Sequence, residues 1–323
     1  MAPLPFNMAL MEFLAAHRTA FLTHLFLAAT FLGDTGGYIL IVTLIYVAWN
    51  KRLAVRLSVL VLLASSLNVV LKLIVKNPRP FVREGTYLEK WAVSPRAARG
   101  LAAQYSTPSG HAMGAAAFYP YLYKSVKKSY IRVIAVTAVV LIGISRPYLG
   151  VHYAEDVLIG WAIGLGIALV AIRYAPAIDT LWDRLSYGQQ VGVAVFGGLA
   201  IWLLAIALNG GRLDGQPREA LCNAGFLAGI ILARPLELRR VNFDPHSLDV
   251  VAKVLRFLLS AALMAGTLLT FGWASAAIPS EFLLLANLLE YLRFAAAGFV
   301  VIFVAPLLFT TMGLAERTAA EAN

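Results

Sequence analysis

The chain has 323 residues, of which 60% are hydrophobic and only 14% are charged. A soluble domain usually carries about a quarter charged residues, so this chain lacks the side chains needed to form a soluble surface. The net charge of +10 comes from short basic clusters between apolar runs, without the basic and aromatic stripe of a nucleic-acid-binding surface. The composition therefore excludes a soluble protein, argues against nucleic acid as a partner, and predicts an integral membrane protein with many spans.

Cys222 is the single cysteine, so the chain can form neither an intramolecular disulfide nor a metal cluster built from several thiolates. Residues 1–7 lack the basic start and the small-residue cleavage site of a secretory signal. We expect the first apolar segment to act as an uncleaved anchor in the bilayer.

Apolar runs follow one another along the whole chain, and a helix needs about 17–25 residues to cross the hydrocarbon layer. The pattern predicts an all-α, polytopic transmembrane helix bundle. It also predicts two parts: a core over residues 1–180, which holds all three polar motifs, and an extension over 181–323 with about four more spans. The runs cover residues 8–32, 36–49, 54–75, 109–123, 131–145, 153–172, 188–209, 219–233, 254–274 and 282–312.

The distribution of basic residues predicts the orientation. Loops rich in Lys and Arg stay on the cytoplasmic side, which fits the basic residues at Lys51, Lys124–Arg132, Arg173/Arg184 and Arg234–Arg240. The loops after Ile74, after Ile144 and at 210–218 then face outward. The 76–107 loop is basic too and so opposes the rule. One interpretation is that these cations only lie in a solvated loop. Anion binding is the better interpretation, because Lys72 and Arg79 lie on either side of the start of the loop.

The first polar motif is Lys72-x6-Arg79-Pro80. Lys72 ends an apolar helix, where a lysine can simply extend its ammonium to the membrane interface. Asn77-Pro78-Arg79-Pro80 then stops the helix, because prolines cannot continue it. Lys72 and Arg79 are therefore expected at one membrane depth, and such a pair can grip phosphate oxygens.

The second motif is Pro108-Ser109-Gly110-His111, which precedes an apolar run. Pro108 or Ser109 is expected at the start of a helix, and Gly110 allows close approach of another backbone. A helix that begins here offers free N–H groups and a positive dipole end to an anion. A lone histidine in a first turn is usually only a polar cap. Beside a bound phosphate, however, His111 is a candidate general acid.

The third motif is Ser145-Arg146-x5-His152-x3-Asp156. The i, i+4 spacing places His152 and Asp156 on one helix face, where the carboxylate can accept one imidazole N–H and leave the other nitrogen free to attack. Arg146 would be a third cation for phosphate. A metal site on the two histidines is disfavoured, because the cations would repel it and Glu155 projects about 100° away from Asp156. A purely structural His–Asp pair is the other alternative.

Together the three segments resemble the tripartite signature of the type 2 phosphatidic acid phosphatase superfamily, over about residues 20–175. The resemblance implies a six-helix core with an externally facing site and neither metal nor other cofactor. It assigns phosphate binding to five residues, protonation of the leaving group to His111, nucleophilic attack on phosphorus to His152, and activation of that histidine to Asp156. The five are Lys72, Arg79, Ser109, Gly110 and Arg146.

The resemblance implies an integral-membrane hydrolase that removes phosphate from a membrane lipid, in a bacterial inner membrane with its site facing the periplasm. Soluble vanadium haloperoxidases share the signature, but the hydrophobicity argues against them. Two stretches, 105–113 and 145–152, are also similar to sphingosine-1-phosphate phosphatases. The extension loosely resembles the nine-span glucose-6-phosphatase plan without matching its residues. Neither the substrate nor the oligomeric state follows from the sequence.

Two other functions stay open. The same core could pass the phosphoryl group to another lipid or sugar, as a phosphotransferase. A lipid transporter is the third hypothesis, for which Arg293 in the last apolar run is the best support, although a pair with Glu290 explains that arginine more simply. Substrate specificity is expected in the 81–107 loop, where the candidates are Phe81, Tyr87, Trp91 and Tyr105.

Overall fold

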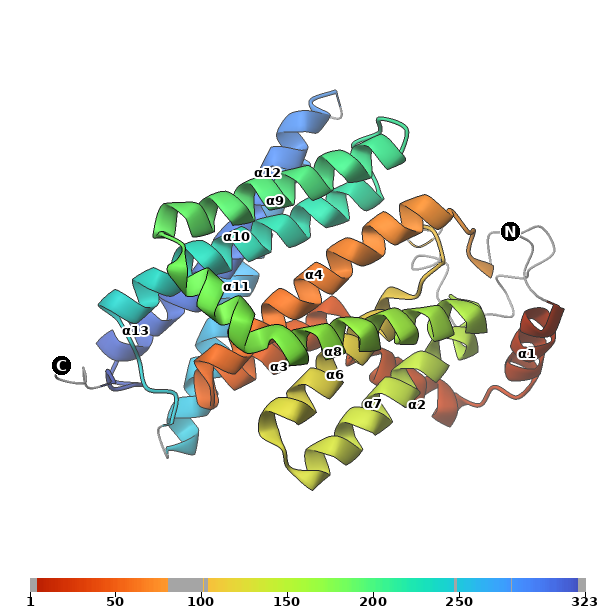
Figure 1. Ribbon diagram of the computed structural model, residues 1–323, viewed down its shortest axis with the longest axis horizontal. Helices are drawn as coiled ribbons and strands as arrows, with labels where there is room; N and C mark the ends of the chain where they lie inside the picture. The colour runs from red at the N-terminus through yellow and green to blue at the C-terminus, as the bar shows by residue number, and fades with distance from the viewer. Residues whose placement is uncertain (1–4, 81–100, 102–103, 247–248, 280, 319–323) are drawn as a thin grey trace. The chain divides into compact units, whose positions relative to one another are not determined.

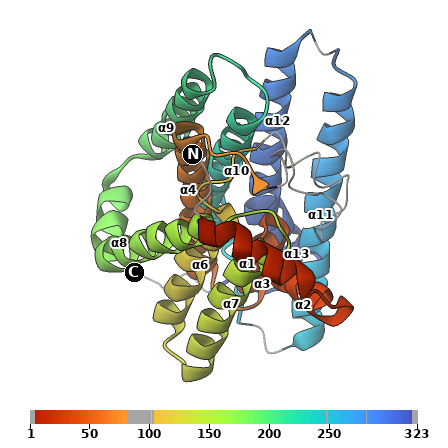
Figure 2. The same ribbon diagram turned by 90° about the vertical axis from the view of Figure 1, so that its right-hand side faces the viewer.

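The computed structural model describes residues 5–80, 101, 104–246, 249–279 and 281–318. Within these ranges the chain is helical, and its one β-type pairing is an isolated antiparallel bridge between Phe243 and Arg317. The expected all-α fold class is confirmed (Figures 1 and 2). In chain order the helices are α1 (Pro5–Ala16), α2 (Ala20–Phe31), α3 (Thr35–Ala48), α4 (Lys51–Val75), α6 (Gly110–Val126), α7 (Ser129–Tyr148), α8 (Ala154–Arg184), α9 (Tyr187–Leu208), α10 (Gln216–Arg240), α11 (Val250–Ala276), α12 (Leu283–Phe299), the π-helical η3 (Val300–Val304) and α13 (Ala305–Thr311).

Seven helical segments among the described residues are long and apolar enough to cross a membrane, and an eighth candidate is the pair α2 and α3. The chain is therefore a multi-span integral membrane protein. The ten apolar runs exceed this number for local reasons. The first run splits into two helices of 12 residues each, α2 and α3 are bent by 58° at their junction, and α6 has only 17 residues.

The bend between α2 and α3 lies at Gly33-Asp34, in the gap between the apolar runs 8–32 and 36–49. The Tyr119 hydroxyl donates a hydrogen bond of 2.9 Å to the carbonyl of Leu32, a carbonyl that the bend frees from helical pairing. Asp34 then starts α3 by accepting a 2.8 Å hydrogen bond from the backbone N–H of Thr35. This bend brings the Asp34 carboxylate toward His111 at the start of α6.

The chain forms two compact units. Unit 1 comprises Met1–Tyr38 and Leu63–Pro176, and unit 2 comprises Ile39–Leu62 and Ala177–Asn323. Each unit is described by itself.

In unit 1, α6 and α8 approach closely because small residues line their contact. A Cβ atom on Gly164 would lie 2.2 Å from the carbonyl oxygen of Met113, and one on Gly160 would lie 2.8 Å from that of Ser109. Glycines at an i, i+4 spacing thus let the α6 backbone lie directly against α8. This contact fixes the start of α6 beside the start of α8.

In unit 2, α10 packs against α12 in the same way. A Cβ atom on Gly225 would lie 2.4 Å from the Tyr291 carbonyl oxygen, and one on Gly229 would lie 2.0 Å from that of Ala295. The expected pair of Arg293 with Glu290 is present at 3.3 Å, and Arg218 approaches the same carboxylate at 2.9 Å.

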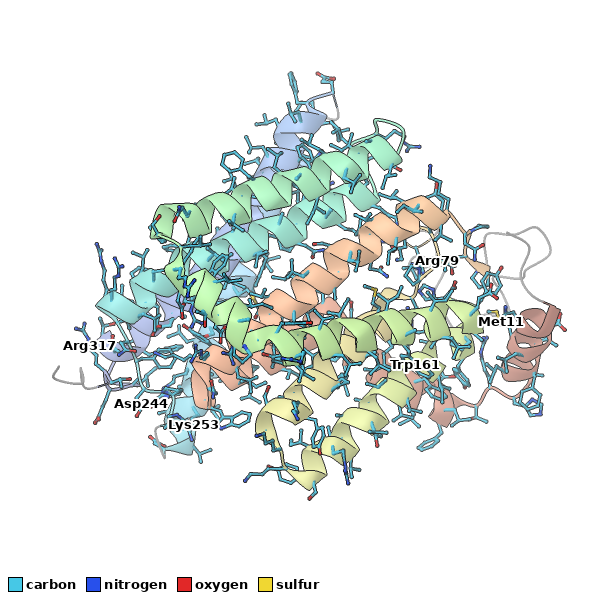
Figure 3. The ribbon with its side chains drawn as sticks, in the orientation of Figure 1. Met11, Arg79, Trp161, Asp244, Lys253 and Arg317 are labelled. Carbon is cyan, nitrogen blue, oxygen red and sulfur yellow. The ribbon has the colours of Figure 1, made fainter. Side chains whose placement is uncertain are left out.

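The isolated β-bridge of unit 2 lies near Asp244 and Arg317, which are labelled in Figure 3. The backbone N–H of Asp244 donates to the carbonyl of Glu316 at 2.9 Å. The buried Arg256 guanidinium donates to the carbonyl of Leu314 at 2.7 Å. These contacts join the C-terminal segment to α11.

Substitution of Gly164 by Ala should destabilise the protein, because the added Cβ would overlap a backbone oxygen that cannot move without shifting α6. We expect a loss of about 1–3 kcal/mol, measured as a lower Tm in detergent. Gly166→Ala on the same helix is the control: nothing lies within 4 Å of its Cβ position, so its Tm should stay equal or rise slightly. Equal Tm values for wild type and Gly164→Ala would contradict the close contact.

Candidate active site

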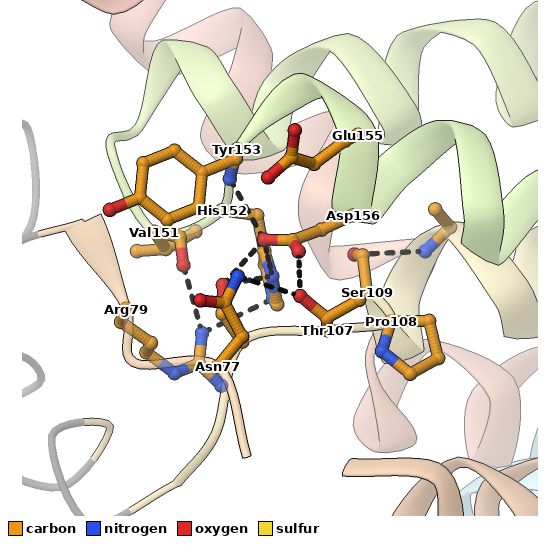
Figure 4. Close-up of polar contacts among 12 residues, drawn as sticks. Asn77, Arg79, Thr107, Pro108, Ser109, Val151, His152, Tyr153, Glu155 and Asp156 are labelled. Carbon is orange, nitrogen blue, oxygen red and sulfur yellow. Dashed lines mark hydrogen bonds and ion pairs between the residues drawn. The ribbon is translucent and has the colours of Figure 1, made fainter. Parts of the chain in front are cut away.

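The three signature segments meet in unit 1 (Figure 4). Lys72 is buried in the last turn of α4, and that helix ends at Val75, before the two prolines, as the sequence predicts. Arg79 lies just beyond this end (Figure 3). The loop before α8 carries His152, and the first turn of α8 carries Asp156.

The Arg79 guanidinium is buried, and each of its three nitrogens donates a hydrogen bond. Its Nε donates to the carbonyl of Gln104 at 3.2 Å, one terminal nitrogen donates to the Gln104 side-chain oxygen at 3.1 Å, and the other donates to the carbonyl of Val151 at 3.1 Å. A planar group fixed in this way is pre-organised for an anion. The nitrogen that contacts Val151 also lies 3.2 Å from Nε2 of His152.

These contacts determine the tautomer of His152. A guanidinium only donates hydrogen bonds, so the Nε2 atom facing Arg79 must be the unprotonated acceptor. Nδ1 then carries the proton, and it lies 3.3 Å from Oδ2 of Asp156 and 3.2 Å from Oγ of Ser106. The His152 side chain is only 2% exposed. Its lone pair therefore points at the cation that would hold an anion.

The Asp156 carboxylate is fully buried and accepts hydrogen bonds at both oxygens. The Ser106 hydroxyl and the Tyr153 backbone N–H, the latter at 2.9 Å, both donate to Oδ2. The Thr107 hydroxyl donates to Oδ1. Asn77 in turn donates from Nδ2 to the Thr107 hydroxyl at 2.9 Å. This shell stabilises the ionised carboxylate and fixes its direction toward His152.

The start of α6 lies beside Asp156. Ser109 is the N-cap of α6, as predicted: its side chain accepts from the Ala112 backbone N–H, and its own N–H donates to the Asp156 carbonyl at 2.9 Å. A Cβ atom on Gly110 would lie 3.0 Å from the Asn68 side-chain oxygen, so a larger residue would crowd this turn. The hydroxyl of Ser109 accepts at the cap and keeps its own proton to donate.

Arg146 is buried in the last turn of α7. One terminal nitrogen donates to the Thr30 hydroxyl of α2, while the buried Nε–H has no hydrogen-bond partner among the residues that the structure describes. A buried, unsatisfied donor on a cation costs free energy until an acceptor reaches it. An anion between the helices would supply that acceptor.

His111 is the second residue of α6, and its side chain is 26% exposed. The charges of Arg146, Lys72 and Arg79 reach its ring electrostatically, and the His152 ring lies within the same range. Its Nε2 lies 3.9 Å from the carboxylate of Asp34 at the bend before α3. The three expected phosphate-binding cations and His152 are thus within electrostatic range of His111 in unit 1.

The pKa of the His152 imidazole is held well below its usual range, first by burial and then by the adjacent Arg79 charge. The imidazole is therefore neutral at physiological pH, the state a nucleophile requires. Protonation occurs only at lower pH than in the unfolded chain, so this residue makes folding less favourable as the pH falls through about 6.5.

Several polar residues around the site carry no sequence signal of their own. Ser106, Thr107 and Gln104 lie in a loop, and nothing in their spacing indicates that they hold Asp156 and Arg79. The Glu155 carboxylate accepts a 2.6 Å hydrogen bond from the Asn7 side chain. Within the described ranges, no cluster of three or more His, Cys, Asp and Glu side chains could hold a metal ion.

Three of the four specificity candidates in the 81–107 loop lie outside the residues that the structure describes. These are Phe81, Tyr87 and Trp91. Tyr105 is half-buried directly before the two hydroxyl residues that hold Asp156.

Comparison with known protein families gives two matches. Residues 53–179 match a profile described as "PAP2 superfamily", and residues 221–317 match one described as "PAP2 superfamily phosphatase, transmembrane extension". Together the two matches cover more than half of the chain, and the first contains every signature residue.

Two curated relatives are similar to parts of the chain. It is 44% identical over 70 residues, 19% of this chain, to phosphatidylglycerophosphatase B of Bacillus subtilis. It is 28% identical over 125 residues, 38% of this chain, to an undecaprenyl-diphosphatase of Sulfolobus acidocaldarius. The chain spans only 34% and 56% of the length of these relatives.

Two solved structures are also similar. One is the transmembrane PAP2 type phosphatidylglycerolphosphate phosphatase from Bacillus subtilis, 27% identical, covering 54% of this chain and 86% of its own, with a TM-score of 0.41. The other is Aquifex aeolicus LpxE, 22% identical, covering 53% of this chain and 97% of its own, with a TM-score of 0.43.

We expect the His152 imidazole to stay neutral between about pH 8 and pH 5, because a proton would add charge to a buried site beside Arg79. Arg79→Gln removes one of the two causes and should move the pKa of His152 upward. Ring ¹⁵N shifts of histidine-labelled protein, assigned by comparison with His152→Ala, measure both effects. A wild-type ring that titrates near 6.5 would contradict the geometry.

Proposed function

Because the chain belongs to the PAP2 superfamily, we propose that it is an integral-membrane lipid phosphatase that works through a phosphohistidine at His152. The observation that carries this proposal is the fixed orientation of that imidazole, with Nδ1 toward Asp156 and the lone pair of Nε2 toward Arg79. A histidine that served only as packing would need no cation facing its open nitrogen.

The first chemical step is attack of the Nε2 lone pair on phosphorus. The N–P bond forms as the bond from phosphorus to the lipid oxygen breaks, and His111 gives its proton to that oxygen. Three cations, Lys72, Arg79 and Arg146, neutralise the phosphoryl oxygens, and the first turn of α6 adds hydrogen bonds from Ser109 and Gly110.

The second step is hydrolysis of the phosphohistidine. Water attacks phosphorus, His111 now accepts a proton from that water, and the N–P bond breaks to release inorganic phosphate and neutral His152. In both steps the Asp156 carboxylate stabilises the positive charge on the imidazole through Nδ1–H. The fixed cations take the place that a divalent ion has in metal-dependent phosphatases, so the mechanism requires no metal.

The substrate class we propose is a lipid phosphomonoester or diphosphate. The names of the two curated relatives, a phosphatidylglycerophosphatase and an undecaprenyl-diphosphatase, both denote this chemistry. We place the site on the periplasmic side of a bacterial inner membrane, from the basic loops assigned to the cytoplasm. We further propose that residues 1–180 carry the reaction and that 181–323 form an added membrane segment.

His152→Ala should reduce phosphate release by several orders of magnitude, because it removes the imidazole that would form the covalent intermediate. The measurement is inorganic phosphate released in detergent micelles from a panel of five substrates: phosphatidate, sphingosine phosphate, phosphatidylglycerophosphate, undecaprenyl diphosphate and glucose 6-phosphate. His17→Ala, an exposed histidine of unit 1, is the matched control. A His152→Ala protein with wild-type turnover on the best substrate would overturn the proposal.

His111→Ala should lose about 10²–10⁴-fold in kcat on an alkyl phosphate, the usual contribution of a general acid. With an aryl phosphate, whose leaving group needs no proton, the loss should be less than about tenfold. Equal losses on both substrates would remove the general-acid role while leaving a role in binding.

Mass balance separates hydrolysis from phosphoryl transfer. With a single purified lipid substrate, one inorganic phosphate should appear for each product lipid, and EDTA should leave the rate unchanged. Product lipid without inorganic phosphate would establish a transferase, and strong inhibition by EDTA would contradict the metal-independent mechanism.

A further inference from the structure

Unit 2 contains a cavity of about 260 Å³ between helices α3, α4 and α10. All three helices contribute residues close to an end: α3 its last turn, α4 its first two turns, and α10 its last two turns. Helix ends gathered in this way mark the surface of a bilayer rather than its centre. The lining residues are Tyr46, Lys51, Arg52, Val55, Arg234, Glu237 and Leu238.

Three of the lining side chains are cations and one is an acid, so the cavity wall carries a net positive charge. The acid, Glu237, already has partners within the protein. Glu237 forms a 2.8 Å ion pair with Lys51 and accepts a hydrogen bond from the Phe243 backbone N–H at 3.3 Å. Lys51 also donates to the Asn242 side chain at 3.2 Å. The charges of Lys51 and Glu237 therefore neutralise each other. The remaining charges on the cavity wall are those of Arg52 and Arg234.

Arg52 is only loosely compensated. Its nearest carboxylate, Asp179, lies 3.4 Å away and also pairs closely with Arg56. The Arg52 side chain is 60% exposed, so it can turn toward a ligand at little cost. Two arginines therefore share one carboxylate at this edge of the cavity.

Arg234 is the strongest sign of a missing partner. Its guanidinium makes no hydrogen bond or ion pair within the described part of the chain, although the residue is partly buried. The charges that reach it belong to Arg52, Glu237 and Asp183, with the polar Tyr46 beside them. Of these, only Glu237 is an acid that lines the cavity, and it already forms an ion pair with Lys51. An anion in the cavity would therefore gain charge-assisted hydrogen bonds from a guanidinium that has no acceptor in the described part of the chain.

We propose that this cavity binds the phosphate group of an anionic membrane lipid, with Arg234 and Arg52 as its ligands. Arginine forks match phosphate oxygens in pairs. The apolar wall favours a lipid over a free anion, because Val55 is buried there and Leu238 is 46% exposed beside the arginines. Basic pockets between transmembrane helices on the cytoplasmic side commonly hold anionic head groups, and the basic clusters assign this end of α4 to that side.

The test uses the full-length protein in neutral detergent and measures Tm during titration with three probes. These are short-chain phosphatidylglycerol, short-chain phosphatidylcholine and inorganic phosphate. The variant is Arg234→Gln. The matched control is Arg240→Gln, an exposed arginine of the same helix end that does not line the cavity. Arg79→Gln is titrated as well, since it removes anion binding at the active site only.

We expect phosphatidylglycerol to raise Tm saturably, and phosphatidylcholine not to. Arg234→Gln should weaken the apparent affinity for phosphatidylglycerol about five- to tenfold, while Arg240→Gln and Arg79→Gln keep it. Arg52→Gln changes an exposed side chain and so should not disturb folding. It should weaken the apparent affinity for phosphatidylglycerol by a similar factor. Without lipid, Arg234→Gln should melt no lower than wild type, because the guanidinium has no bond to lose.

Three results would overturn the proposal. The first is an unchanged affinity in both Arg234→Gln and Arg52→Gln. The second is a response to phosphatidylglycerol that disappears in Arg79→Gln, since the lipid would then bind at the active site. The third is stabilisation through Arg234 by inorganic phosphate but not by the lipid, since the ligand would then be a soluble anion. Each of these results is independent of whether the protein hydrolyses phosphate.

Discussion

Two opposite charges fix the imidazole of His152 from its two sides, and the other parts of the site follow from that arrangement. Arg79 faces Nε2 and Asp156 faces Nδ1, so both the tautomer and the ring direction are set. In a buried site such interactions are stronger than in water. They also keep the ring neutral, because an added proton would lie beside a fixed cation. A site with several buried cations and one open lone pair is suited to a phosphoryl group.

The position of these charges depends on backbone contacts that bring three helix ends together. The Ser109 N–H bonds to the Asp156 carbonyl, and glycines on α8 let α6 lie against it. The prolines after α4 release the chain so that Arg79 can reach Val151. Small residues and helix breakers thus provide the geometry, while the charged residues provide the chemistry.

Residues whose chemistry depends on regular spacing were predictable from the sequence. His152 and Asp156 are one turn apart, Ser109 is a helix cap, and the apolar runs give the all-helical fold. The hydroxyls of Ser106 and Thr107 were not predictable, because a loop has no period that would aim them at Asp156. Asp34 was missed for the same reason: it reaches the neighbourhood of His111 only through the 58° bend between α2 and α3.

Unit 2 shows a second way of using buried and half-buried cations. At the active site the cations surround a nucleophile, whereas in unit 2 they line a cavity that contains no histidine among its described walls. The role of His152 has a direct measurement: mass spectrometry of protein quenched in alkali during turnover, which preserves phosphohistidine. We predict one phosphoryl group on Nε2 of His152. A phosphoryl group on another residue, or on Nδ1 of His152, would contradict the account.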